Sequence, residues 1–167
     1  EAEGDLGVDA GLGGGREVAV AHQAEVDAAH LAGRRHRTGG GQVPVVAPLA
    51  RDEQGVVCNV NADDAAAGIA AGLGARQLVL MTDVDGIRAA DGTRLDTITP
   101  AQAEALIADG TIRGGMVPKV RAALAALAWE GSEAIIADGS APDALARALD
   151  DPTFGTRVSA RAHAGAA

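Results

Sequence analysis

Residues 59–64 read Asn-Val-Asn-Ala-Asp-Asp and are followed by an alanine-rich run that ends in Gly-Leu-Gly at residues 72–74. Asn61 is a good helix N-cap, because its side-chain oxygen can accept hydrogen bonds from the first free N–H groups of a helix. Asp64, three residues later, supplies the acidic position of a capping box, and aspartates in the first turn suit the positive end of the helix dipole. The stretch therefore predicts a strand end, a tight polar turn and a buried helix over residues 61–73 with a glycine C-cap.

Two later turns have the same character. Residues 77–82 are mostly apolar and predict a strand, which ends in Asp83-Val84-Asp85-Gly86-Ile87. Residues 114–119 read Gly-Gly-Met-Val-Pro-Lys and open another helix. Three polar or glycine-rich turns, each after a strand or before a helix, are what an open parallel sheet needs to build a nucleotide site at one edge.

The remaining segments continue this alternation of apolar strands and helices, which predicts an α/β fold with a mainly parallel sheet. The run at residues 43–49 is continuously apolar, as expected of a buried parallel strand. Thr99 and Pro100 predict a helix start with a capping box and a proline at the first position. We place the strands at residues 43–49, 56–58, 77–82, 133–137 and 155–160, the helices at 61–73, 100–110, 118–130 and 140–149, and a hairpin turn at Asp91-Gly92.

Composition excludes several classes of function. The 167 residues suffice for one domain with a real core. A net charge of −9 and an aromatic content of 1% argue against nucleic-acid binding, which needs a basic face or stacking side chains. The single cysteine, Cys58, excludes an internal disulfide and a multi-cysteine zinc site. Without an apolar run of about 20 residues or a signal-peptide pattern, we expect no membrane span and a cytoplasmic protein.

Residues 1–42 have a different composition, rich in glycine, histidine and arginine. Their glycine tracts lack the strand and the Gly-Lys-Ser/Thr ending of a phosphate-binding P-loop. Their three histidines, His22, His30 and His36, are not spaced as metal ligands, so we expect no metal site. We expect residues 1–42 to be a poorly ordered leader without strands, residues 43–160 to form the domain, and residues 161–167 to be a frayed tail.

Residues 43–160 resemble the C-terminal half of the amino-acid kinase family, in its branch that phosphorylates N-acetyl-L-glutamate. Four motifs carry the resemblance, namely residues 59–63, 82–87, 115–120 and the closing Gly155-Thr156-Arg157. The resemblance implies a three-layer α/β sandwich and transfer of the γ-phosphoryl group of ATP to a side-chain carboxylate, a step of arginine biosynthesis. A carboxylate is already ionised at pH 7, so this reaction needs no general base.

The resemblance also implies residue roles, ATP with Mg²⁺, an amino-acid derivative as substrate, and a homo-oligomer when the protein is full length. Lys119 would neutralise the transferring group, and a bound phosphoryl oxygen would relieve its unfavourable place near a helix start. The alternative is a solvated lysine on a surface helix, and for residues 83–86 it is a turn held by aspartate side chains. The implied residues are Lys119 and Asp63 for catalysis, Asn59 and Asn61 for the substrate, and Asp83, Val84, Asp85, Gly86, Ile87, Arg88, Thr111, Ile112 and Arg113 for the nucleotide.

One departure from the family is serious. Its N-terminal half carries a lysine–glycine–glycine phosphate site and a glycine pair with an arginine, and no lysine precedes Lys119 here. We therefore expect a fragment, with residues 1–42 a misread frame or a decayed segment. Two alternatives stay open: a sister kinase acting on carrier-linked aminoadipate, aspartate, carbamate or a nucleotide, and a non-catalytic remnant that binds ATP weakly or only associates with itself.

Overall fold

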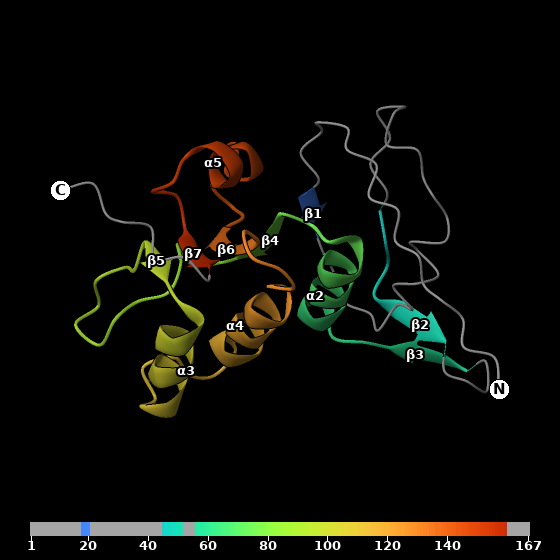
Figure 1. The fold of residues 1–167 in the computed structure, drawn as a ribbon, viewed down its shortest axis with the longest axis horizontal. Helices are drawn as coiled ribbons and strands as arrows, with labels where there is room; N and C mark the ends of the chain where they lie inside the picture. The colour runs from blue at the N-terminus through green and yellow to red at the C-terminus, as the bar shows by residue number, and fades with distance from the viewer. Residues whose placement is uncertain (1–17, 21–44, 52–55, 160–167) are drawn as a thin grey trace.

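The computed structural model describes residues 18–20, 45–51 and 56–159. Its main sheet has five strands in the order β1-β4-β6-β7-β5 (Figure 1). The β1–β4, β4–β6 and β5–β7 pairs are parallel, and the β6–β7 pair is antiparallel. The bounds are Val18–Val20 for β1, Gln77–Thr82 for β4, Thr97–Ile98 for β5, Glu133–Asp138 for β6 and Thr156–Ser159 for β7.

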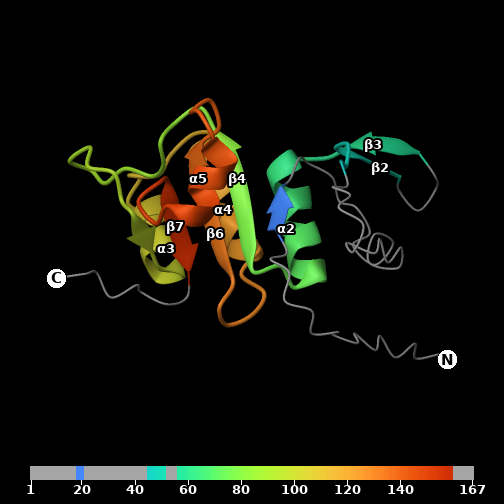
Figure 2. The ribbon, with the colours of Figure 1, turned by 90° about the horizontal axis from the view of Figure 1, so that it is seen from above.

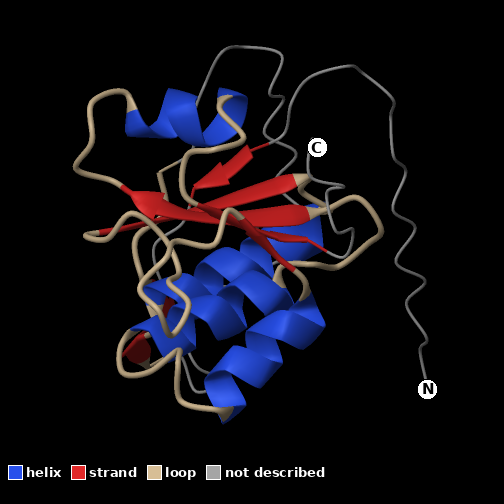
Figure 3. Cartoon of the chain, turned by 90° about the vertical axis from the view of Figure 1, so that its left-hand side faces the viewer, coloured by secondary structure: helices blue, strands red, loops and turns tan. Residues whose placement is uncertain are grey.

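Helices cover both faces of this sheet, so the predicted α/β sandwich with a mainly parallel sheet is confirmed. Figure 3 shows one group of helices below the sheet and a short helix above it. The first group comprises α2 (Ala62–Leu73), α3 (Pro100–Ala108) and α4 (Met116–Ala125), and the short helix is α5 (Ala144–Asp150). No helix within the described ranges is long and apolar enough to cross a membrane.

The strand side chains alternate between two cores, as the period of two in a strand requires. Leu78 and Leu80 of β4 pack in the larger core under α2, α3 and α4, together with Ile136 of β6. Val79 and Ile135 point to the opposite face and pack with α5. The sheet is thus buried on both sides, which explains why β4 and β6 read as continuous apolar runs.

Helix α2 forms as its sequence predicts. The Asn61 side chain accepts hydrogen bonds from the N–H groups of Asp63 and Asp64, at 3.1 and 3.2 Å. Gly74 ends the helix with a left-handed φ of 61°. The reciprocal capping-box bond expected from Asp64 is not formed in this described segment, because aspartate is one methylene shorter than the glutamate or glutamine of a capping box. Helix α3 does have the complete box, between Thr99 and Gln102.

The predicted buried strand at residues 43–49 is wrong. Strand β2 (Leu49–Arg51) instead pairs antiparallel with β3 (Val57–Asn59) in a separate two-stranded sheet. Val45, just before it, is 95% exposed. Figure 2 shows this hairpin beyond α2, away from the main sheet. An apolar run by itself does not distinguish a buried strand from an exposed one, and the prolines at 44 and 48 remove backbone donors that a central strand needs.

Several elements also differ from the prediction: strand β5 was not predicted, and helix α3 ends at Ala108 rather than residue 110. Strand β1 lies inside residues 1–42, where we expected no strand, and its three residues are too short to show a period. Helix α4 begins at Met116 rather than Pro118 and ends at Ala125 rather than near residue 130. Helix α5 begins at Ala144 rather than residue 140, because the chain first passes through Asp143, whose φ is 54°. The histidines, glycine tracts and tail discussed above lie outside the described residues.

Candidate functional site

Lys119 and Asp63 form an ion pair. Lys119 Nζ lies 2.8 Å from Asp63 Oδ1, and the two side chains are 15% and 21% exposed. Lys119 follows the first turn of α4 and Asp63 is in the first turn of α2, so the pair joins the starts of two helices. Lys119 is also the only lysine of the sequence. It is therefore a half-buried, paired cation rather than a solvated surface lysine.

The start of α4 is open and positively polarised. Its N-cap, Gly115, makes no side-chain capping bond, and no acidic residue lies in the first turn. A side chain at Gly114 or Gly115 would meet nothing within 4 Å, so the backbone here can be approached closely. The N–H groups of Met116 and Val117 donate to the carbonyls of Arg113 and Gly114, and Pro118 has no N–H, so it is the helix dipole that favours an anion at this terminus. Together with the Lys119 ammonium, this place suits a phosphate group.

Both helix starts lie toward one edge of the sheet. Helix α2 leads into β4 and α4 leads into β6, and these two strands are parallel. A helix that leads into a parallel strand begins near the carboxyl ends of the strands, where open α/β sheets bind their ligands. The predicted turn at residues 83–88 follows β4 directly, so it belongs to the same edge.

Local hydrogen bonds hold the turn at residues 83–88. The Arg88 guanidinium donates to both carboxylate oxygens of Asp85, at 3.0 and 2.9 Å, and to the Gly92 carbonyl at 2.7 Å. The Asp83 carboxylate accepts a bond from the Thr82 hydroxyl. The predicted turn at Asp91-Gly92 is confirmed, since the N–H of Gly92 donates to the carbonyl of Ala89. Hydrogen bonds within the protein therefore hold this loop in place.

Residues 111–113 connect α3 to the glycines before α4. The N–H of Thr111 donates to Asp109 Oδ1, and this bond together with one from the Thr111 hydroxyl lowers the pKa of Asp109. Within the described residues, no hydrogen bond or ion pair joins residues 111–113 to residues 83–88. Ile87 and Ile112, one from each segment, are buried and belong to the same core. A ligand could contact these isoleucines through the backbone but not through the side chains.

The two asparagines before α2, Asn59 and Asn61, differ in which side-chain groups remain available to a substrate. Asn59 is the last residue of β3, and it is exposed. The Asn61 oxygen is occupied by the two capping bonds, so its amide nitrogen is the group that remains for a substrate. Both asparagines lie within four residues of Asp63 in the chain.

Sequence reasoning missed a second turn at this edge, Asp138-Gly139-Ser140. Asp138 lies opposite Thr82 in the sheet, and the N–H of Gly139 donates to the Thr82 carbonyl at 2.9 Å. The Asp138 carboxylate accepts bonds from the Ser140 hydroxyl and the Ser140 N–H, which lower the pKa of Asp138 in that order of size. A polar–glycine–polar triplet directly after a strand was the available signal, as at residues 83–86.

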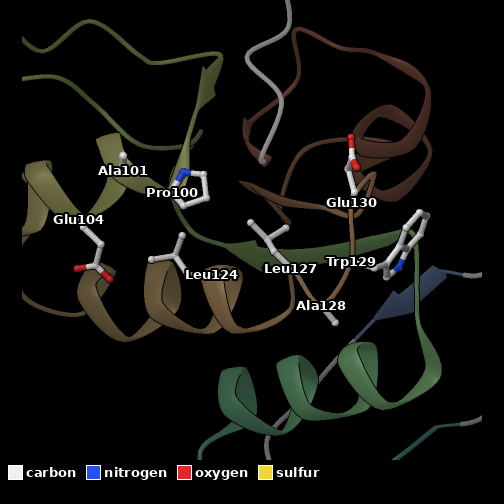
Figure 4. A pocket seen from close by; sticks show the side chains of 8 residues that line it. All are labelled: Pro100, Ala101, Glu104, Leu124, Leu127, Ala128, Trp129 and Glu130. Carbon is white, nitrogen blue, oxygen red and sulfur yellow. The ribbon is translucent and has the colours of Figure 1, made fainter.

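An open groove of about 700 Å³ lies between the start of α3 and the end of α4 (Figure 4). Leu124, Leu127 and Trp129 form much of its wall, and Glu104 and Glu130 add two carboxylates. Apolar side chains and negative charge do not suit a polyphosphate. None of the groove residues is a predicted site residue, so we place the candidate site at the Lys119–Asp63 pair and not here. In the part of the chain that the structure describes, no three histidine, cysteine or acidic side chains gather as metal ligands.

Comparison with known proteins identifies relatives. The model of the "Amino acid kinase family" matches residues 6–138, starting inside the segment 1–42 where we expected no family pattern. The chain is 36% identical over 150 residues to acetylglutamate kinase of Marinomonas sp. (strain MWYL1), covering 89% of this chain and 50% of that protein. It is 49% identical over 120 residues to acetylglutamate kinase of Rubrobacter xylanophilus, covering 72% and 46%. The chain thus spans about half the length of these curated relatives.

Solved structures give the same fold. The N-acetylglutamate synthase of Neisseria gonorrhoeae, complexed with coenzyme A and L-arginine, matches with a TM-score of 0.69 and 27% identity. That match covers 79% of this chain and 31% of the synthase chain. Carbamate kinase from Giardia lamblia bound to AMP-PNP matches with a TM-score of 0.52 and 30% identity, covering 66% of this chain and 36% of the kinase.

Proposed function

The chain belongs to the amino acid kinase family, and we propose that it is the nucleotide-binding half of an enzyme that phosphorylates N-acetyl-L-glutamate. The reaction would move the γ-phosphoryl group of ATP to the side-chain carboxylate and release ADP and an acyl phosphate. The observation that carries the proposal is the Lys119–Asp63 pair at the joined starts of α2 and α4. The acetylglutamate kinases among its relatives support the choice of substrate.

To catalyse this phosphoryl transfer, the protein has mainly to position the two substrates and to supply positive charge near the transferring group. The acceptor carboxylate is ionised at neutral pH and attacks without a base. Lys119 would stabilise the charge on the transferring phosphoryl oxygens, and the positive end of the α4 dipole would add to this field. Asp63 would hold the ammonium in place through its 2.8 Å contact. Mg²⁺ would enter with ATP, would be held mainly by phosphates and water, and would neutralise charge on the phosphate oxygens.

The turns at the carboxyl edge would hold the rest of the nucleotide. Residues 83–88 and 111–113 are proposed to contact it through backbone groups and exposed polar side chains, since the isoleucine side chains are buried. Asn59 and the Asn61 amide would contact the acylated amino acid. The remaining proposals follow the family: arginine biosynthesis, a cytoplasmic location, and a homo-oligomer of the full-length protein.

Two alternatives have a specific observation in their favour. The similarity to carbamate kinase favours a sister kinase that acts on another carboxylate or carbamate. The presence of only one lysine favours a remnant that binds ATP without turnover, because phosphoryl transfer in the family uses a second lysine from the other half.

Substrate-dependent release of ADP from MgATP separates these alternatives. N-acetyl-L-glutamate, aspartate, aminoadipate and carbamate are offered in turn to the chain and to a longer protein that contains both halves. We expect ADP release with N-acetyl-L-glutamate in the longer protein and MgATP binding by the chain alone. Turnover with carbamate or aspartate instead would support a sister kinase, and no MgATP binding by either protein would overturn the proposal.

A further inference from the structure

The closing motif Gly155-Thr156-Arg157 has no assigned role, yet one of its side chains reaches the proposed nucleotide loop. Thr156 begins β7 and is fully buried. Its hydroxyl accepts a hydrogen bond from the N–H of Ile87 at 2.8 Å and donates one to the carbonyl of Leu95 at 2.6 Å. A threonine hydroxyl has one proton to donate, so both its donor and an acceptor site are used within the protein.

These two bonds close the base of the loop. The chain leaves β4, turns at residues 91–92 and returns to β5, with Arg88 and Arg94 opposite each other in an antiparallel bridge. The N–H of Leu95 donates directly to the carbonyl of Ile87 at 2.8 Å. In an antiparallel hydrogen-bonded pair the two residues exchange two such bonds. Here the second bond is replaced by the Thr156 hydroxyl, which bridges the Ile87 N–H and the Leu95 carbonyl.

The backbone around Thr156 is packed too closely to admit side chains at the neighbouring glycines. A Cβ atom at Gly86, whose φ is 138°, would lie 2.6 Å from Thr156 Oγ1. A Cβ atom at Gly155, whose φ is 83°, would lie 2.6 Å from the carbonyl oxygen of Ile136. Arg94 adds a third link, since it donates to the Thr153 carbonyl at 2.6 Å. The loop is therefore fixed against the start of β7 from both of its arms.

We propose that Thr156 is a positioning residue for the nucleotide: its hydroxyl sets the backbone of residues 83–88 in the geometry that binds an adenine nucleotide. This inference rests on the proposed function. Thr156 is too deeply buried to touch the ligand, and it acts through the N–H of Ile87. The same glycine–threonine motif that carried the resemblance is thereby given a physical task, in which Gly155 lets β7 approach β6 and Thr156 reaches across to the loop.

The test compares variants that keep or lose the hydroxyl. Thr156→Val keeps the shape and loses both bonds, whereas Thr156→Ser keeps the hydroxyl. Ser132→Ala is the matched control, because Ser132 is also buried and donates to a carbonyl, that of Trp129 at 2.7 Å, away from the loop. The measurements are the hydrogen-exchange rate of the Ile87 amide by NMR and the MgADP dissociation constant by calorimetry.

We expect Thr156→Val to speed Ile87 exchange and to weaken MgADP binding about tenfold, the effect of losing hydrogen bonds worth roughly 1.4 kcal/mol. Thr156→Ser and Ser132→Ala should both stay near the wild-type affinity. If Thr156→Val does not fold, Thr156→Ala against Thr156→Ser isolates the hydroxyl, since both variants lack the methyl group.

Equal MgADP affinity in the variants with and without the hydroxyl would overturn the inference and leave the proposed function standing. A wild-type chain that binds no MgADP would instead overturn the proposed function, and this inference with it.

Discussion

Lys119 Nζ and Asp63 Oδ1 lie 2.8 Å apart although 56 residues separate them in the chain. The pair fixes the start of α4 beside the start of α2. It gives each of two half-buried charges an opposite charge as a partner. It also holds the only lysine of the sequence near the start of α4, whose N-cap Gly115 makes no side-chain capping bond. One contact thus serves both the packing of two helices and the proposed phosphate site.

Lys119→Ala should lower the rate of phosphoryl transfer in a longer protein that contains both halves by about 100-fold or more, the typical effect of losing a transition-state charge contact. Folding should survive, with a loss of about 1–2 kcal/mol in the free energy of unfolding from the broken pair. ADP release and a thermal melt measure the two effects. Arg121→Ala is the control, because its pair with Glu104 is exposed and 3.7 Å long, so neither quantity should change. Near-normal turnover of Lys119→Ala would sink the mechanism.

Gly155→Ala should destabilise the protein far more than Gly92→Ala. Both glycines have left-handed φ values, 83° and 85°, so each substitution costs roughly 1 kcal/mol in backbone strain. Only at Gly155 would the new Cβ also meet a backbone oxygen, at 2.6 Å, whereas at Gly92 it meets nothing within 4 Å. Urea unfolding measures the difference, which we expect to be about 2 kcal/mol or more. Equal losses at the two positions would contradict the close approach of β7 to β6.

Ser140→Ala should raise the pKa of Asp138 toward that of a free aspartate side chain without fully reaching it. The Ser140 hydroxyl is the larger cause of the lowered pKa, and the Ser140 N–H bond remains in the variant. Because the folded-state pKa is lowered, this interaction favours folding above the unfolded-state pKa and is lost as pH falls through the folded-state value. A carboxyl-carbon NMR titration follows Asp138, with Asp109 as the unchanged internal reference. Identical Asp138 titrations in wild type and variant would refute the assignment.

Glu133→Ala should cost about 3–5 kcal/mol of unfolding free energy, because it leaves the buried Arg157 guanidinium without its counter-ion. Arg157 Nη1 lies 2.8 Å from Glu133 Oε1, and the side chains are 7% and 16% exposed. Glu104→Ala breaks an exposed ion pair instead and should cost at most about 0.5 kcal/mol. Chemical denaturation compares the two variants, and similar losses would mean that the Arg157 pair contributes no more than a surface one.

Elements with local signals could be predicted, and elements that depend on distant neighbours could not. The ends of α2 could be predicted from its N-cap Asn61 and its C-cap Gly74, and the start of α3 from the capping box at Thr99. The β2–β3 hairpin was misjudged, because burial of an apolar run is decided by what packs on it. Likewise α4 ends at Ala125, and the chain after it is held by Trp129, which donates to the Gly74 carbonyl at 3.1 Å across 55 residues.

The same division holds at the site. The turns at residues 83–88 and 114–119 are visible in sequence as glycine and polar residues beside strands and helices. The roles of Lys119 and Asp63 came from the family resemblance, and spacing alone gave no reason to pair them. The Thr156 bridge to Ile87 spans 69 residues, so only a three-dimensional structure reveals it.

The most direct test of the proposed site is the NMR signal of Lys119. Lysine-selective ¹³C labelling reports on this one side chain, because the sequence contains no other lysine. We predict that its terminal methylene resonance shifts and saturates as MgATP is added, and that Asp63→Asn weakens this response. A Lys119 resonance that stays unchanged while MgATP binds elsewhere, or does not bind at all, would contradict the placement of the phosphate site at the Lys119–Asp63 pair.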